Sequence, residues 1–166
     1  MGRTVSVSLL ALVLALGLAV PAVAESETVK GTGDVKKLFA NNAKKAVVAK
    51  VFGIGQPCEV AKQLYIEIRW GKKQAYQVQS GCYGGTTWGK GLYFLSDRSD
   101  PNTAKKVKCA DFKLTFNSDK VFHKAFVPRK CMGKAPNRVK LKTEGVNYAG
   151  SATGGQAGPT SLLDRG

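Results

Sequence analysis

The chain has 166 residues, which suits a single domain, and its 26 lysines and arginines outnumber 11 aspartates and glutamates. It has one histidine and no cysteine or histidine pairs at zinc-ligand spacing, which excludes the common zinc motifs and leaves few groups for acid–base catalysis. We therefore expect no catalytic residue, no metal site and no cofactor.

Residues 1–24 have the pattern of a secretory signal peptide. Arg3 supplies a short positive start, residues 5–20 are apolar, and a small-x-small motif ends at Ala24. The apolar run is shorter than the roughly 20 residues of a membrane-spanning helix. We expect cleavage after Ala24, export of the mature chain out of the cell, and no transmembrane segment after cleavage.

The mature chain is strongly basic. Only Arg3 of the 26 basic residues lies in the leader, so 25 cations against 11 carboxylates leave a net charge of +14. Such a field attracts anionic polymers and surfaces, with a strength that falls as salt rises, but it also serves simply to keep a protein soluble. The expected partner is an anionic cell-wall polymer or a glycan, with nucleic acid bound only non-specifically. Charge does not define the oligomeric state.

The four cysteines indicate two disulfides, because an even number in an exported chain is typical of disulfide-stabilised domains. Of the three connectivities, we expect Cys58–Cys82 and Cys109–Cys131, since each of these loops encloses one predicted hairpin. In the chain-entropy model, each loop stabilises the fold by about 3 kcal/mol.

The first predicted hairpin follows a short polar segment. Residues 35–40 and 46–52 are rich in β-forming residues and flank the turn-like segment 41–45. An amphipathic helix over residues 34–50 is the alternative. Its central pair of asparagines and its adjacent valines disfavour that helix.

A second strand pair has the clearest alternation in the chain. Over residues 64–70, leucine, isoleucine and tryptophan alternate with polar residues, which is typical of an antiparallel strand with one buried face. The chain turns at Gly71 and a second strand leads to Cys82. A further strand is expected at 92–95, followed by a polar connection over 97–106.

The third predicted hairpin is clamped by cysteines. Residues 109–116 and 121–127 flank a turn over 117–120, and one cysteine lies just outside each strand. His123 lies on the second strand, on the same face as its apolar neighbours two and four residues on. A partly buried structural role for this histidine is therefore favoured over catalysis.

The last predicted strand covers residues 138–144, and its outward face is basic. About eight short strands separated by turn residues predict an all-β fold, an antiparallel β-sandwich stapled by two disulfides. We expect this single domain to cover residues 34–148, after a flexible leader at 25–33 and before a flexible Gly/Ser-rich tail at 149–166.

The glycine-rich segment 81–91 is the best candidate for a binding loop. Tyr83 and Trp88 offer flat faces for stacking on a sugar ring or a base, and Lys90 and Arg98 are candidate anion contacts. The competing interpretation is that Trp88 folds back onto the end of the sandwich and the glycines only form turns.

The basic strand offers three further candidate ligand contacts, Arg138, Lys140 and Lys142, which lie on one face of the predicted strand. Cations in such a row can bind phosphates. They can equally solvate an exposed sheet face and prevent edge pairing between molecules.

These features favour a secreted, non-catalytic binding protein. One alternative is a small ribonuclease- or glycosidase-like hydrolase with His123 as its base. Another is a protease inhibitor or protein-binding module that presents residues 82–91. Asp97, Asp100 and Asn102 offer oxygen ligands for calcium, but their spacing lacks the glycine and the closing glutamate of an EF-hand, which favours a solvated loop.

The segments Val127–Gly133 and Ala135–Val139 resemble small secreted β-rich proteins of actinobacteria that contain a disulfide-clamped hairpin and have no assigned function. The strand start at Gly33–Lys36 is similar to theirs as well. The resemblance covers about half of the mature chain. It implies the β fold and the Cys109–Cys131 pair, and it implies no catalytic residue.

Overall fold

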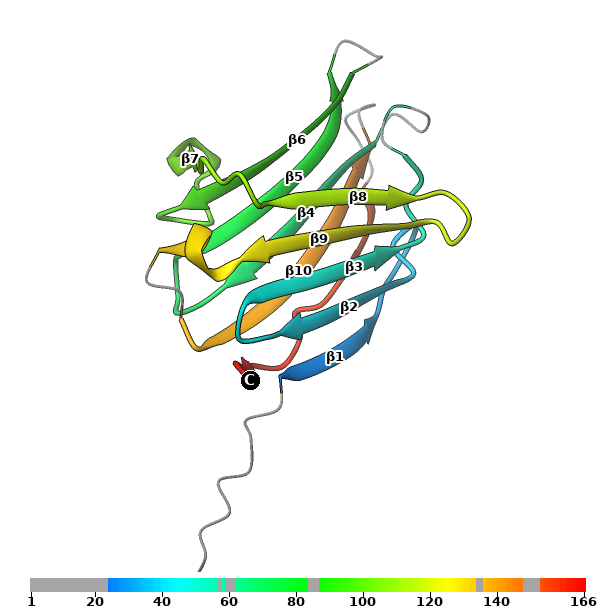
Figure 1. Ribbon diagram of the computed structural model, residues 1–166. Coiled ribbons are helices and arrows are strands. Elements are labelled where there is room, and N and C mark those ends of the chain that lie inside the picture. The colour runs from blue at the N-terminus through cyan, green and yellow to red at the C-terminus, as the bar shows by residue number, and fades with distance from the viewer. Residues whose placement is uncertain (1–23, 57, 59–61, 84–86, 134–135, 148–152) are drawn as a thin grey trace, which may run out of the picture.

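The computed structural model describes residues 24–166 except 57, 59–61, 84–86, 134–135 and 148–152. Residues 1–23 lie outside this part, so the signal peptide stays a prediction. Two antiparallel sheets pack face to face, and Figure 1 looks onto the smaller sheet with the larger one behind it. Within the described residues, no helix has the length and apolar character needed to cross a membrane.

The smaller sheet has five strands in the order β1-β2-β3-β9-β8, and every neighbouring pair is antiparallel. The pairs β2–β3 and β8–β9 are the first and third predicted hairpins. The strands are β1 (Glu25–Lys30), β2 (Lys37–Asn42), β3 (Ala46–Phe52), β8 (Lys113–Asn117) and β9 (Phe122–Pro128).

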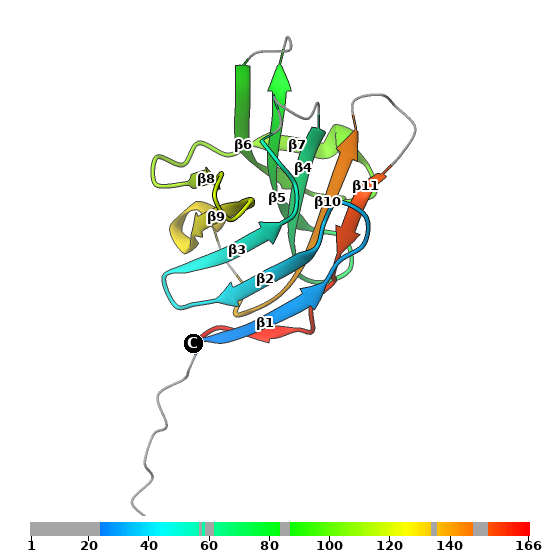
Figure 2. The same cartoon turned by 90° about the vertical axis from the view of Figure 1, so that its right-hand side faces the viewer.

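The larger sheet runs β11-β10-β4-β5-β6-β7, and β12 pairs with the start of β10. Figure 2 shows the paired ends of β5 and β6 extending beyond the rest of the sandwich. Two 3₁₀ helices, η1 (Pro101–Thr103) and η2 (Arg129–Met132), follow β6 and β9. The strands are β4 (Lys62–Arg69), β5 (Ala75–Tyr83), β6 (Thr87–Leu95), β7 (Ala104–Lys106), β10 (Arg138–Asn147), β11 (Thr153–Ala157) and β12 (Leu163–Asp164).

The core lies between the two sheets and follows the alternation of the sequence. Leu64 and Ile66 of β4 and Val51 of β3 are almost completely buried, while their chain neighbours face outward. Burial of such a side chain stabilises the fold by about 1.5–3 kcal/mol. The predicted β-sandwich is confirmed, with twelve strands among the described residues where about eight were expected. The additional strands are β1, β7, β11 and β12.

The expected flexible leader is instead a strand. Residues 25–30 form β1, which pairs with β2 along its whole length. The Glu27 carboxylate accepts hydrogen bonds from the backbone N and the Oγ of Ser161, at 2.7 and 2.6 Å, and the Glu25 carboxylate accepts one from the backbone N of Asp164. The leader was predicted as flexible because its residues are mostly polar, and a local pattern does not show its contacts with Ser161 and Asp164, which lie more than 100 residues away in sequence.

The prediction of a flexible tail is also wrong for residues 153–166. The backbone N of Asp34 donates to the carbonyl of Gly154 at 2.7 Å, and that of Thr32 donates to the carbonyl of Gln156 at 2.9 Å. Gly155 has a φ of 110°, and a Cβ there would lie 1.9 Å from the Thr32 carbonyl oxygen. The glycines therefore allow two backbones to approach closely, a role that composition does not distinguish from flexibility.

Both predicted disulfides are confirmed. Cys58 pairs with Cys82 and Cys109 pairs with Cys131, with Cα–Cα distances of 4.9 and 5.6 Å. The described part of the chain contains no free cysteine. Two structural disulfides are typical of domains that fold in an oxidising, extracellular compartment.

A buried polar cluster joins β2, η2 and β12. The Asn42 side chain, with no exposed surface, donates to the carbonyls of Asn137 and Leu163 at 2.9 and 2.8 Å and accepts from the Arg129 guanidinium. Arg129 also donates to the carbonyl of Pro136 at 2.7 Å. Burial lowers the pKa of Arg129 to about 10, so the guanidinium still carries its charge at neutral pH.

Candidate functional site

Trp88 and Lys90 lie on β6, in the segment that was expected to be a binding loop. The Trp88 ring packs against the hydrophobic core, and its Nε1 donates to Ser80 Oγ at 2.6 Å. Lys90 Nζ donates to the carbonyl of Leu114 on β8 at 3.2 Å and thus joins the two sheets. The segment is the paired ends of β5 and β6 rather than a loop, and residues 84–86 and the Tyr83 side chain lie outside the described part.

The structure separates the three cations of β10. Arg138 forms an ion pair with Asp164 at 2.7 Å, on a strand that the sequence did not predict. Lys140 and the exposed Arg98 both line a hollow of about 380 Å³ near the end of the larger sheet. Lys142 lines a different groove.

That groove, of about 270 Å³, lies on the outer face of the larger sheet and contains both signs of charge. Lys142 shares it with Glu67 and Glu144. The Arg69 Nε donates to the Glu67 carboxylate at 2.6 Å, which neutralises a further cation of this face. The outer face of the larger sheet is therefore not a continuous cationic surface.

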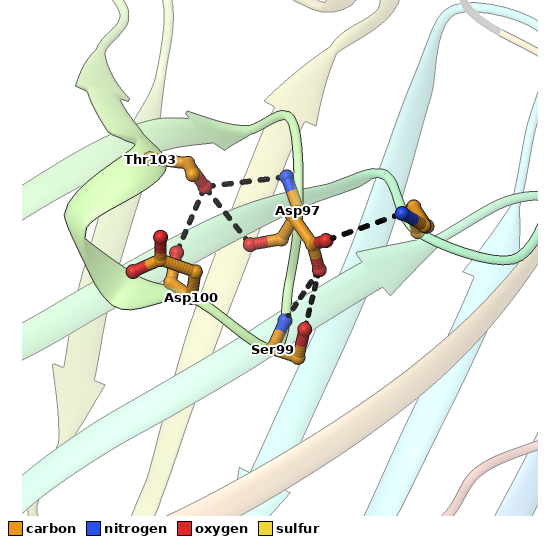
Figure 3. A network of polar contacts seen from close by, with 5 residues as sticks. Asp97, Ser99, Asp100 and Thr103 are labelled. Carbon is orange, nitrogen blue, oxygen red and sulfur yellow. Dashed lines mark hydrogen bonds and ion pairs between the residues drawn. The ribbon is translucent and has the colours of Figure 1, made fainter.

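The loop that contains Asp97, Asp100 and Asn102, the possible oxygen ligands for calcium, is held by hydrogen bonds within the loop itself (Figure 3). The Asp97 carboxylate accepts from the backbone N and the Oγ of Ser99, at 3.0 and 2.6 Å, and these bonds lower its pKa. Thr103 Oγ1 donates to the carbonyls of Asp97 and Asp100. No cluster of three or more metal-ligating side chains occurs among the described residues.

His123 is fully buried, which is more than the partial burial expected from sequence. Its Nε2 lies 3.1 Å from the carbonyl of Gly55, which makes this nitrogen the protonated one, and its Nδ1 is buried without a hydrogen-bond partner. Trp88 and Phe116 pack around the ring at centroid distances of 6.3 and 4.8 Å. A general base must reach the proton that it removes, and this imidazole has no exposed surface.

Acidification below about pH 6.5 is expected to destabilise the fold through His123. Burial lowers its pKa in the folded state, so the unfolded chain binds the extra proton more readily and stability falls as pH falls. The loss is up to about 1.4 kcal/mol per pH unit between about pH 6.5 and the folded pKa. Urea unfolding at pH 7 and pH 5 checks this, with His123→Gln as the comparison. A wild-type loss equal to that of the variant would contradict the assignment.

The outer face of the smaller sheet has a different composition from that of the larger sheet. Its strand register places three outward residues from each of five strands in three parallel rows. We call these positions the lysine–phenylalanine face, and they are Lys30, Lys37, Phe52, Phe122 and Asn117 in the first row, Thr28, Phe39, Lys50, Lys124 and Thr115 in the second, and Ser26, Asn41, Val48, Phe126 and Lys113 in the third.

No carboxylate occurs at any of these positions, and the face therefore carries five positive charges. Two lysine pairs lie directly opposite each other across neighbouring strands, Lys30 with Lys37 and Lys50 with Lys124. Like charges directly opposite each other destabilise a sheet. The face thus contains a local cost to stability that a bound anion would relieve.

The lysines and the aromatic rings of this face are in contact. Lys37 Nζ lies 4.5 Å from the centroid of the Phe52 ring, and Lys50 Nζ lies 5.7 and 5.8 Å from those of Phe39 and Phe122. Such cation–π contacts hold the ammonium groups over half-buried rings. The surface therefore alternates between charge and flat apolar area.

At the β8–β9 end of the face there is a shallow hollow of about 210 Å³. It is lined by Lys113, Lys124, Thr115 and Phe126, whose side chains carry two ammonium groups, one hydroxyl and one phenyl ring. These groups can bind an anionic oxygen beside a planar apolar group.

This face was not predicted from the sequence. In β3 and β9 the inward positions are small or aliphatic apart from His123, and the phenylalanines point outward, so a hydrophobicity pattern assigns the rings to the core. The available signal was the alternation of lysine and phenylalanine two residues apart, as in Phe122, Lys124 and Phe126. The order of the strands in the sheet, which brings the rows together, is a tertiary feature.

Comparisons of the chain with protein-family models, with curated proteins and with solved structures found no match. The functional inference therefore rests on the geometry and charge of the described residues.

Proposed function

We propose that the protein is an extracellular, non-catalytic binding protein that captures anionic polymers of the cell envelope on its lysine–phenylalanine face. The observation that carries this proposal is the single sign of charge, five lysines and no carboxylate, on one whole face of a sheet. The expected net charge of +14 after cleavage at Ala24 adds a long-range attraction for the same ligands.

Two further observations support the proposal. The opposed pair of Lys50 and Lys124 has no carboxylate opposite it in the sheet register, so an external polyanion is the natural source of counter-charge. Two disulfides fit a protein that acts outside the cell. A hydrolase with His123 as its base has no support, because the imidazole is inaccessible.

Sedimentation of the purified protein with isolated cell-wall material, repeated over a salt series, tests the proposal. The wild type is expected to be retained at low salt and released steeply as salt rises, because counterion release drives the binding. The double substitution Lys50→Gln with Lys124→Gln is expected to release the protein at clearly lower salt.

The matched control is Lys140→Gln with Lys142→Gln, which removes the same charge from the larger sheet. If both double variants lose retention equally, net charge alone drives binding and the lysine–phenylalanine face is not the site. Retention that does not respond to salt would also contradict the proposal.

A further inference from the structure

The aromatic rings of the lysine–phenylalanine face point to the class of polymer that it binds. A purely cationic surface would bind any polyanion, but four phenylalanines among the five lysines offer flat apolar area beside the charges. The fitting ligand has a repeating unit with both an anionic group and a planar ring. Nucleotides have this combination, and base stacking on aromatic side chains is tolerant of sequence.

We propose that the lysine–phenylalanine face binds single-stranded nucleic acid, with bases stacked on the phenyl rings and phosphates on the lysines. This inference rests on the proposed function because it uses the same face. It extends the ligands of this face from the cell-envelope polymers of the proposed function to nucleic-acid strands with unpaired bases.

The hollow beside Phe126 is where both contacts are available together. The phenyl ring and the ammonium groups of Lys113 and Lys124 line one cavity, so a base and its own phosphate can bind side by side. On the neighbouring strand β3, Lys50 lies directly opposite Lys124 and over the Phe39 ring of β2. Transfer of that ammonium group from the ring to a phosphate would free the ring face for stacking.

The dimensions of the face suit a strand of several nucleotides. Five antiparallel strands at about 4.8 Å spacing span about 19 Å. The sandwich presents this surface on the outside of the smaller sheet, which faces the viewer in Figure 1. Nucleic-acid-binding domains of comparable size contact about 4–16 nucleotides.

Two other occupants are disfavoured. The exposed large apolar side chains among the described residues are Val121 and Leu162, so the half-buried rings of this face are not placed for insertion into a bilayer. A second copy of the chain would bring five lysines against five lysines, and that repulsion opposes face-to-face dimerisation.

Fluorescence anisotropy with a labelled oligothymidylate tests the inference, with polyphosphate of about equal charge and phosphatidylglycerol vesicles as the other probes. We expect the oligothymidylate to bind more tightly than the polyphosphate. Phe126→Leu and Phe39→Leu are each expected to weaken oligothymidylate binding about tenfold and to leave polyphosphate binding unchanged, because a stacked ring is lost and every charge is kept.

The outcomes separate the two proposals. Equal binding of both polymers, with no effect of either phenylalanine substitution, would overturn the nucleic-acid inference and leave the polyanion proposal standing. Binding to neither polymer would overturn both. Vesicle binding tighter than oligothymidylate binding would identify a membrane surface as the ligand instead. Thermal unfolding of the two leucine variants verifies that each is folded, and one folded variant is enough for the test.

Discussion

Replacement of Asn42 by alanine is expected to lower the free energy of unfolding by about 3 kcal/mol. The side chain makes three hydrogen bonds with no exposed surface, one of them with a buried guanidinium. Removal leaves two carbonyls and a charged group without this partner, and each such group costs about 1–3 kcal/mol. The Arg129 Nε is already buried without a partner among the described residues, so a further lost hydrogen bond leaves the guanidinium still less satisfied.

Urea unfolding with intrinsic tryptophan fluorescence measures this change. The matched control is Asn41→Ala, which removes the neighbouring side chain from the outer face of the same strand and is expected to cost about 0.5 kcal/mol or less. Equal stabilities of the two variants would show that the Asn42 cluster contributes little to holding the C-terminal strand against β2.

Replacement of Lys124 by glutamate is expected to make the protein more stable and a weaker binder. In the folded sheet Lys124 lies directly opposite Lys50, and Lys113 is its diagonal neighbour on β8. A carboxylate at this position turns repulsion into attraction and is expected to add about 0.5–1 kcal/mol, or about 2–4 °C in Tm, at low salt. The same change removes a phosphate contact and repels polyanions, which is expected to weaken binding roughly tenfold.

Opposite effects on stability and binding separate a functional charge from a structural one. The measurements are the Tm at low salt and the affinity for oligothymidylate under the same conditions. A lower Tm would show that the opposed lysines are not a cost to the fold. Unchanged affinity would place the binding surface elsewhere on the molecule.

The sequence predicted the fold class and both disulfides because these depend on local patterns. Alternation over residues 64–70 placed one face of β4 in the core, and the spacing of the cysteines around predicted hairpins selected their pairing. Both ends of the chain were predicted as flexible, although β1 and the segment after residue 153 bind each other. Each lacks a core of its own, and contacts between distant segments do not appear in a local pattern.

The candidate site was predicted less well than the fold. Trp88 was considered as a stacking residue because of its glycine-rich surroundings, yet Gly81, Gly89 and Gly91 lie in paired strands and the indole packs on the core. Arg138 and Lys142 share a strand face as expected, but neighbouring carboxylates balance their charges. On the lysine–phenylalanine face, no carboxylate balances the lysine charges. This face depends on which strands become neighbours, and strand order follows from the topology of the whole chain.

The salt dependence of oligothymidylate binding tests the central claim most directly, namely that the lysine–phenylalanine face is the polyanion site. With all five lysines engaged, the slope of log K against log salt is expected to be about −3.5, since each contact to a single strand contributes about −0.7. The double substitution Lys50→Gln with Lys124→Gln should bring the slope to about −2, while Lys140→Gln with Lys142→Gln should leave it near the wild-type value. A slope that is the same in the first double variant as in the wild type would contradict this account.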